Sequence, residues 1–182
     1  MRIELLRRYF NSKEYYDKLR QREERLSKPL PELYKNILDI YSVNPIEFIE
    51  TFGVIKIPEI DSKTYPFFLF DYQKKIIIKL MESELDDGDH EILIDKPRQM
   101  GITWVMVWYI IWRWLFKRGW SCLIISRKED EVDDGTANPE GSIFGKIRWG
   151  INNLPDELVP EGFITRTPGK RGTSVDLKLK MI

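Results

Sequence analysis

The chain has 182 residues, with 29 basic and 29 acidic side chains, so its formal net charge is zero. This length suits one domain, or one domain with an appended arm, and the balanced charge gives no overall sign of a nucleic-acid partner. One cysteine and one histidine exclude an internal disulfide and argue against a structural zinc site built from these ligands.

The first 60 residues predict a helical N-terminal arm. Residues 2–26 are dense in charge and in residues that favour helix. Asn44 and Pro45 then form a cap followed by a proline, which predicts a helix start, and Gly53 predicts its end. The basic side chains of the arm are either a solvated helical face or a contact surface for a partner or for DNA phosphate.

The second half of the chain predicts a β-α-β unit. Residues 91–95 and 120–126 are short apolar runs that predict buried strands, and residues 103–117 predict the helix between them. Strands joined in this way are expected to be parallel, with a right-handed connection. Residues 142–158 predict an amphipathic helix, and the alternating pattern of residues 163–182 predicts a hairpin.

The longest apolar run, residues 102–116, is the only candidate for a membrane span in the sequence. It is too short to cross about 30 Å of hydrocarbon comfortably, and Arg113 lies near its end. The run therefore favours a buried helix of a soluble domain.

The stretch DKPRQMGIT lies between the first predicted strand and the helix, where nucleotide phosphates are commonly held. The usual phosphate loop has the pattern G-x-x-x-x-G-K-[ST]. Gly101 and Thr103 fit it, but Ile102 stands at the lysine position and Lys96 at that of the first glycine. A lysine at the start could still reach the phosphates, and Arg98 adds a second cation. An ordinary connection, with Gly101 in a turn and Thr103 as a cap, is the alternative.

An aromatic patch followed by a glutamine precedes this loop. The residues FLFDYQ end at Tyr72 and Gln73, about 25 residues upstream of the loop. Aromatic faces stack on purines, and a glutamine amide can both donate to and accept from an adenine edge. Core packing is the alternative for Phe67, Phe68, Phe70 and Tyr72.

Four stretches carry a family resemblance: NPIEFIETFGVI at 44–55, LFDYQKKII at 69–77, KPRQMGITW at 96–104 and IFGKIRWGINNLPDEL at 143–158. Together they resemble the ATPase domain of the large terminase subunit of tailed bacteriophages, the motor that packages DNA into the procapsid. The third stretch is the most specific, because it resembles a variant phosphate loop whose lysine has moved to the start. The resemblance covers roughly residues 44–158.

The resemblance implies an α/β fold of the P-loop NTPase type, a three-layer sandwich with parallel central strands. Residues 1–60 would be its helical arm, and residues 61–182 the N-terminal part of the ATPase domain. A strand ending in Asp-Glu, which would support Mg²⁺ and orient the attacking water, does not follow Thr103. The ATPase core is therefore expected to be incomplete, with that strand, the coupling motif and the nuclease domain beyond Ile182.

The resemblance also implies roles for individual residues, with ATP and Mg²⁺ as cofactors. Lys96 would bind the β- and γ-phosphates, Arg98 would contact or sense the γ-phosphate, and Thr103 would bind Mg²⁺. Lys96 and Arg98 are thus the expected catalytic residues. Gly101 would let the backbone approach the phosphates, and the aromatic-glutamine pair would border adenine. The expected nucleotide site comprises Tyr72, Gln73, Lys96, Pro97, Arg98, Gln99, Met100, Gly101, Ile102 and Thr103.

The implied function is the ATP-binding part of a motor that couples ATP hydrolysis to translocation of double-stranded DNA into the procapsid. The implied partners are DNA, the portal protein, the small terminase subunit and further copies of the chain in a ring, with no membrane partner. The expected location is the cytoplasm of the infected bacterium. Alone, the chain is expected to bind ATP weakly and hydrolyse it poorly. Two alternatives remain open: a helicase-like P-loop ATPase, and a non-enzymatic interaction module.

Overall fold

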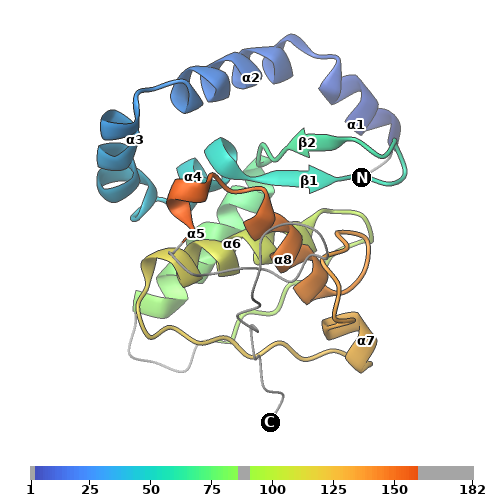
Figure 1. Ribbon diagram of the computed structural model, residues 1–182. Coiled ribbons are helices and arrows are strands. Elements are labelled where there is room, and N and C mark those ends of the chain that lie inside the picture. Colours follow the sequence, from blue (N-terminus) through green and yellow to red (C-terminus); the bar gives the residue numbers. More distant parts are fainter. Residues whose placement is uncertain (1–2, 86–90, 160–182) are drawn as a thin grey trace.

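The computed structural model describes residues 3–85 and 91–159. Helices make up most of this part of the chain, and a small two-stranded sheet lies beneath the N-terminal helices (Figure 1). The predicted hairpin at 163–182 lies outside the described residues.

The first part of the predicted arm consists of two helices, α1 (Ile3–Phe10) and α2 (Lys13–Leu26), so the helical stretch predicted over residues 2–26 is divided. These two helices are called the N-terminal arm below. The division comes at Ser12, whose hydroxyl caps α2 by accepting a hydrogen bond from the Tyr15 amide at 3.2 Å. A new cap at this point ends the first helix and turns the chain. The two helices run across the top of Figure 1.

Polar contacts fasten the arm to α4 (Pro45–Phe52). The Arg22 side chain donates to the Thr51 carbonyl at 2.8 Å, and Arg25 pairs with Glu47 at 2.7 Å. Between arm and α4 the chain forms α3 (Leu30–Asn36) and one π-helical segment, Ile37–Tyr41.

The predicted start and end of α4 are confirmed. The Asn44 side-chain oxygen accepts from the Ile46 and Glu47 amides at 3.1 and 3.2 Å, and Pro45 is the first helical residue. Gly53 follows as the C-cap, and its amide donates to the carbonyl of Ile49. Local capping chemistry alone determines both ends of this helix.

The sheet contains β1 (Val54–Lys56) and β2 (Thr64–Pro66), which pair antiparallel with Ile55 opposite Tyr65. It is followed by α5 (Asp71–Leu85), α6 (Ile102–Phe116), the short α7 (Glu129–Val132), α8 (Ile143–Asn152) and a 3₁₀ turn at Asp156–Leu158. The predicted helix at 103–117 is therefore confirmed within one residue at each end.

The expected P-loop sandwich with parallel central strands is wrong. Residues 91–95 and 120–126 belong to no strand, and β1 and β2 are the only strands in the described residues. Strands of a parallel sheet are covered on both faces, but the side chains of Leu93, Leu123 and Ile125 are 89%, 68% and 79% exposed. Within residues 3–85 and 91–159, neither segment has a neighbouring strand to satisfy its backbone, so an apolar pattern alone does not produce a sheet there.

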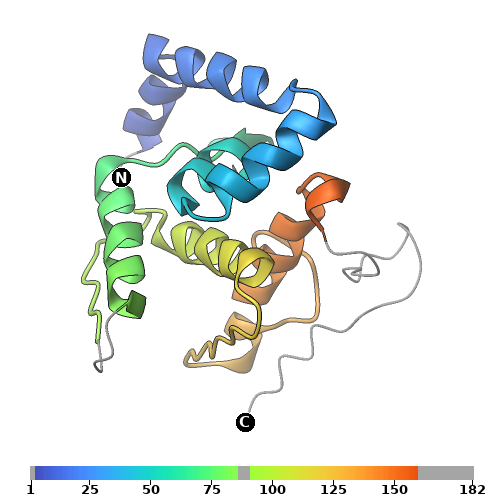
Figure 2. The same ribbon diagram turned by 90° about the vertical axis from the view of Figure 1, so that its left-hand side faces the viewer.

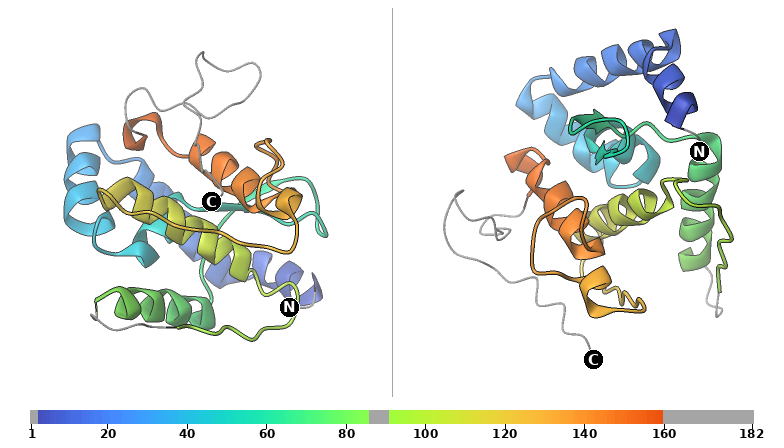
Figure 3. Two further views of the ribbon diagram at one scale, coloured as in Figure 1. Left: turned by 90° about the horizontal axis from the view of Figure 1, so that it is seen from below. Right: turned by 90° about the vertical axis from the view of Figure 1, so that its right-hand side faces the viewer.

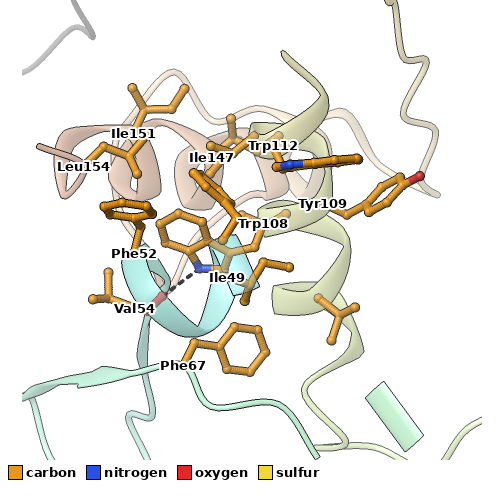
Figure 4. Close-up of a cluster of buried hydrophobic side chains, with 14 of the residues drawn as sticks. Ile49, Phe52, Val54, Phe67, Trp108, Tyr109, Trp112, Ile147, Ile151 and Leu154 are labelled. Atoms are coloured by element: carbon orange, nitrogen blue, oxygen red, sulfur yellow. Dashed lines mark hydrogen bonds between the residues drawn. The ribbon is translucent and has the colours of Figure 1, made fainter. Parts of the chain in front are cut away.

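The core lies around α6, whose buried side chains face α4, the sheet and α8 (Figure 4). The indole of Trp108 donates to the Val54 carbonyl at 2.8 Å, and the indole of Trp112 donates to the Tyr41 carbonyl at 2.7 Å. Both indoles are buried, so these bonds join α6 to β1 and to the π-helical segment at fixed points.

Helix α8 packs directly against α6, and the two lie side by side in Figures 2 and 3. The close approach needs a glycine, because a Cβ on Gly150 would lie 2.7 Å from Ile111 Cδ1. In the described residues, no helix is long and apolar enough to cross a membrane, which agrees with the interpretation of residues 102–116 as a buried helix.

Candidate functional site

The predicted phosphate loop lies immediately before α6 and has an unusual backbone. Gly101 is the N-cap of α6 with φ 69°, and Gln99 adopts φ 63° although it is not a glycine. Residues other than glycine rarely adopt a positive φ, because their Cβ crowds the backbone. The aligned amides of the first turn give this end of the helix partial positive charge. The N-cap residue, Gly101, makes no side-chain cap bond that would occupy them.

Two side chains of α5 hold this loop by a single carbonyl. The Tyr72 hydroxyl and the Gln73 amide nitrogen both donate to the Met100 oxygen, at 2.8 and 3.1 Å. The Gln73 amide oxygen accepts from the Phe70 amide at 3.0 Å. Burial raises the pKa of Tyr72, so its hydroxyl stays protonated and able to donate. The sequence pointed to these two residues as the border of an adenine site, but not to their bonds with the loop.

The loop also depends on Gly101 for space. A Cβ at this position would lie 2.8 Å from the Gln73 amide nitrogen. Because Gln73 is buried and hydrogen-bonded at both ends of its amide, it has little freedom to move away. Gly101, which was predicted to let the backbone approach phosphates, thus also leaves room for the Gln73 side chain that bonds to the loop.

A cavity of about 320 Å³ lies at the start of α6. Its walls come from five parts of the chain: helix α1, the sheet with the segments on either side of it, the start of α5, the predicted phosphate loop with the first turn of α6, and the α7–α8 connection with α8. Figure 2 shows α1, the start of α5 and the start of α6 on the same side of the molecule. Residues of the arm and of the predicted nucleotide site therefore line the same cavity.

The predicted site residues fall into two groups relative to this cavity. Those that line it are Gln73, Lys96, Gln99, Gly101, Ile102 and Thr103, and those outside its lining are Tyr72, Pro97, Arg98 and Met100. Lys96 and Thr103 are both exposed, so a ligand in the cavity could reach the ammonium and the hydroxyl. Arg98 is also exposed, but on the loop surface outside the cavity lining.

Aromatic side chains of the arm form part of the cavity wall. Phe10 stacks on Tyr65 with ring centres 4.4 Å apart, and Tyr9 lies 5.3 Å from Phe70. The sequence indicated Phe70 as part of an aromatic patch but gave the arm no place in the site. Tyr9 and Phe10 are adjacent at the end of a charged segment, and that apolar pair was the only signal available.

Sequence reasoning also missed the contribution of α8. Lys146 and Glu140 line the cavity, although they lie more than 35 residues after the loop. The Lys146 ammonium donates to the Gly141 carbonyl at 2.7 Å. Burial lowers the pKa of Lys146, while the charges of Asp134 and Glu140 act in the opposite direction.

In the described residues, no group of three or more histidine, cysteine or acidic side chains could hold a metal ion by itself. Magnesium, however, often binds through one or two protein oxygens and the phosphates of its substrate. The Thr103 hydroxyl fits that manner of binding, because it lies on the cavity wall beside Lys96.

Comparison with family models, with curated proteins and with solved structures finds no match to the chain. The features of the chain that bear on its function are therefore the cavity and the residues that form it.

Proposed function

We propose that the chain binds Mg²⁺–ATP in the cavity at the start of α6. The observation that carries the proposal is that one cavity has both an aromatic wall and a wall made by a helix N-terminus with a lysine and a threonine. Its volume of about 320 Å³ is at the lower end of the usual range for small-molecule sites.

The aromatic wall suits the base of the nucleotide. Tyr9, Phe10 and Phe70 line the cavity and offer ring surface on which a purine can stack. Gln73 also lines it, and its amide keeps one hydrogen and one lone pair beyond its bonds to the Met100 carbonyl and the Phe70 amide. These remaining groups supply a donor and an acceptor for the edge of adenine.

The polar wall suits the phosphates. The start of α6 directs backbone amides and partial positive charge toward an anion, and Lys96 adds a full charge. The Thr103 hydroxyl would complete the coordination of a Mg²⁺ ion that arrives with the phosphates. Arg98 would reach the γ-phosphate only from outside the present cavity lining.

The role in DNA packaging rests on the four stretches that resemble large terminase subunits. Within this proposal the chain is the ATP-binding part of a ring-forming motor that translocates double-stranded DNA into the procapsid, in the cytoplasm of the infected bacterium. The portal protein and the small terminase subunit are its further partners. We expect slow hydrolysis by this chain alone, because no strand ending in Asp-Glu follows Thr103 in the sequence to support Mg²⁺ and orient the attacking water.

Calorimetric titration of Mg²⁺–ATP into the wild-type chain and Lys96→Ala tests the proposal. Loss of a charge-assisted bond to phosphate should weaken binding by about tenfold or more. Lys75→Ala is the matched control, because Lys75 is an exposed lysine of α5 that does not line the cavity. Equal affinities of wild type and Lys96→Ala, with both proteins folded by circular dichroism, would refute a role for Lys96. No binding by the wild-type chain would refute the nucleotide site itself.

A further inference from the structure

We infer that Lys146 of α8 is a second phosphate-binding cation in this cavity. This inference rests on the proposed nucleotide site and assigns a residue outside the phosphate loop to it. Its geometry is independent of the loop, because α8 reaches the cavity through its own packing on α6.

The face of α8 that carries Lys146 is held at the start of α6. Trp149 lies one turn after Lys146, so the two side chains share a face of the helix. The Trp149 ring meets the ring of Trp104 edge-on, with centres 5.5 Å apart. Trp104 follows Thr103 directly and also lines the cavity. This contact holds the face of α8 that carries Lys146 against the first turn of α6, and both contribute to the wall of the cavity.

The electrostatic setting of Lys146 differs from that of Arg148 and Arg113, two other partly buried cations. Arg148, two residues further along α8, pairs with Asp133 at 2.7 Å, and Arg113 pairs with Glu84 at 2.6 Å. Lys146 forms no ion pair within 4.0 Å in the described part of the chain, although burial lowers its pKa. A half-buried ammonium without a carboxylate partner is costly, and an anionic ligand would offset that cost.

The ammonium retains capacity for a ligand. It has three hydrogens and gives one to the Gly141 carbonyl, so two can still be donated. The charges of Asp134 and Glu140 act on the ammonium without an ion pair within 4.0 Å in the described residues, and Glu140 also lines the cavity, so a triphosphate would have to outweigh repulsion by this carboxylate. A triphosphate bound between Lys96 and Lys146 would link the loop before α6 to the start of α8.

A purely structural role is the competing explanation for Lys146, since its bond to Gly141 supports the connection before α8. The two roles differ in what the phosphates contribute. If Lys146 is only structural, its replacement should change the affinities for ATP and adenosine equally, because both depend on the shape of the cavity. A phosphate-binding lysine would affect only ATP.

The test compares Mg²⁺–ATP and adenosine binding to wild type, Lys146→Gln and Lys146→Arg by calorimetry. Glutamine can still donate to Gly141 but has no charge, so we expect ATP affinity to fall about tenfold with adenosine affinity unchanged. Arginine keeps the charge and should restore most of the ATP affinity. Lys75→Gln, on the exposed face of α5, should match wild type.

The outcomes separate the inference from the proposed function. If wild type binds ATP and Lys146→Gln binds it equally well, or loses ATP and adenosine alike, Lys146 does not bind phosphate, while the nucleotide site stands. If wild type binds neither compound, both the site and this inference are wrong. Thermal melting of each variant shows whether a loss of binding reflects a loss of fold.

Discussion

Met100 shows how much of the site depends on one backbone group. Its carbonyl accepts hydrogen bonds from both Tyr72 and Gln73, and the next residue is the glycine that begins α6. Both donors belong to α5, so this helix holds the loop at the Met100 carbonyl. A change at Gln73 or Gly101 should therefore alter the shape of the loop before it alters the rest of the fold.

Gly101→Ala tests this dependence. A left-handed backbone costs an alanine about 1–2 kcal/mol, and the new methyl group would also meet the Gln73 amide nitrogen. Gly119→Ala is a matched control, because Gly119 has a similar φ of 76° but no atom within 4 Å of its Cβ position. Denaturant unfolding should show a larger loss of stability for Gly101→Ala, by about 1–3 kcal/mol of overpacking strain. Equal losses would mean that Gln73 moves aside freely.

At the residue scale, the sequence predicted which residues belong to the loop better than it predicted their contacts. Gly101 and Thr103 were recognisable from their spacing, and Lys96 from its charge. The contact of Gln73 with the Met100 carbonyl depends on how α5 packs against the loop, which no local pattern encodes. Lys146 was missed for the same reason, since tertiary packing of α8 brings it to the cavity.

Helix α6 is the element on which the rest of the structure is assembled. Its buried Trp108 and Trp112 donate to the carbonyls of Val54 and Tyr41, which precede these tryptophans by 54 and 71 residues. Its first turn forms part of the cavity wall, and its middle packs on α8 at Gly150. The same helix therefore sets both the core and the site.

The indole bonds are tested by Trp108→Phe and Trp112→Phe. Each change leaves a buried carbonyl without its donor, which should lower the free energy of unfolding by about 1–3 kcal/mol. Trp149→Phe is the comparison, because its ring is only partly buried and meets Trp104 edge-on at the surface of the core. Chemical denaturation with fluorescence detection gives the values. Losses no larger than that of Trp149→Phe would mean that the two bonds contribute little.

At the element scale, sequence reasoning succeeded where the determinants are local. The cap at Asn44, the stop at Gly53 and the apolar run of α6 each act within a few residues, and the predicted helices are present. The strands expected at 91–95 and 120–126 failed because a strand needs a partner, and the described chain places none beside them. The apolar composition of these two segments predicted that they are buried, but Leu93 and Leu123 are exposed.

At the scale of the whole molecule, the N-terminal arm and helices α5, α6 and α8 all contribute residues to the wall of the cavity. The arm is fastened by Arg22 and Arg25 to α4, and its aromatic residues meet those of the sheet. Tyr15 is buried within this aromatic cluster, and burial raises its pKa to about 12. Burial likewise raises the pKa of Tyr109 in α6 to about 12. Both tyrosines are therefore protonated in the folded state well above pH 10.

This shift predicts loss of stability at alkaline pH. An unfolded tyrosine ionises near pH 10, so the stability that the neutral form provides is complete below about pH 10 and is lost as the pH rises toward 12. Urea unfolding at several pH values from 8 to 12 measures the decline. Tyr15→Phe should show a shallower decline than wild type, whereas Tyr16→Phe should not, because that side chain is 56% exposed. A Tyr15→Phe curve parallel to wild type would contradict the prediction.

The contact between Trp104 and Trp149 gives the protein a built-in optical probe. Trp104 lines the cavity from the first turn of α6, and Trp149 of α8 contacts Trp104 with ring centres 5.5 Å apart. A nucleotide that displaces water from this wall would change the polarity around Trp104 and hence its emission. Occupancy of the site could therefore be followed by intrinsic fluorescence, without a label, during the same titrations that measure affinity.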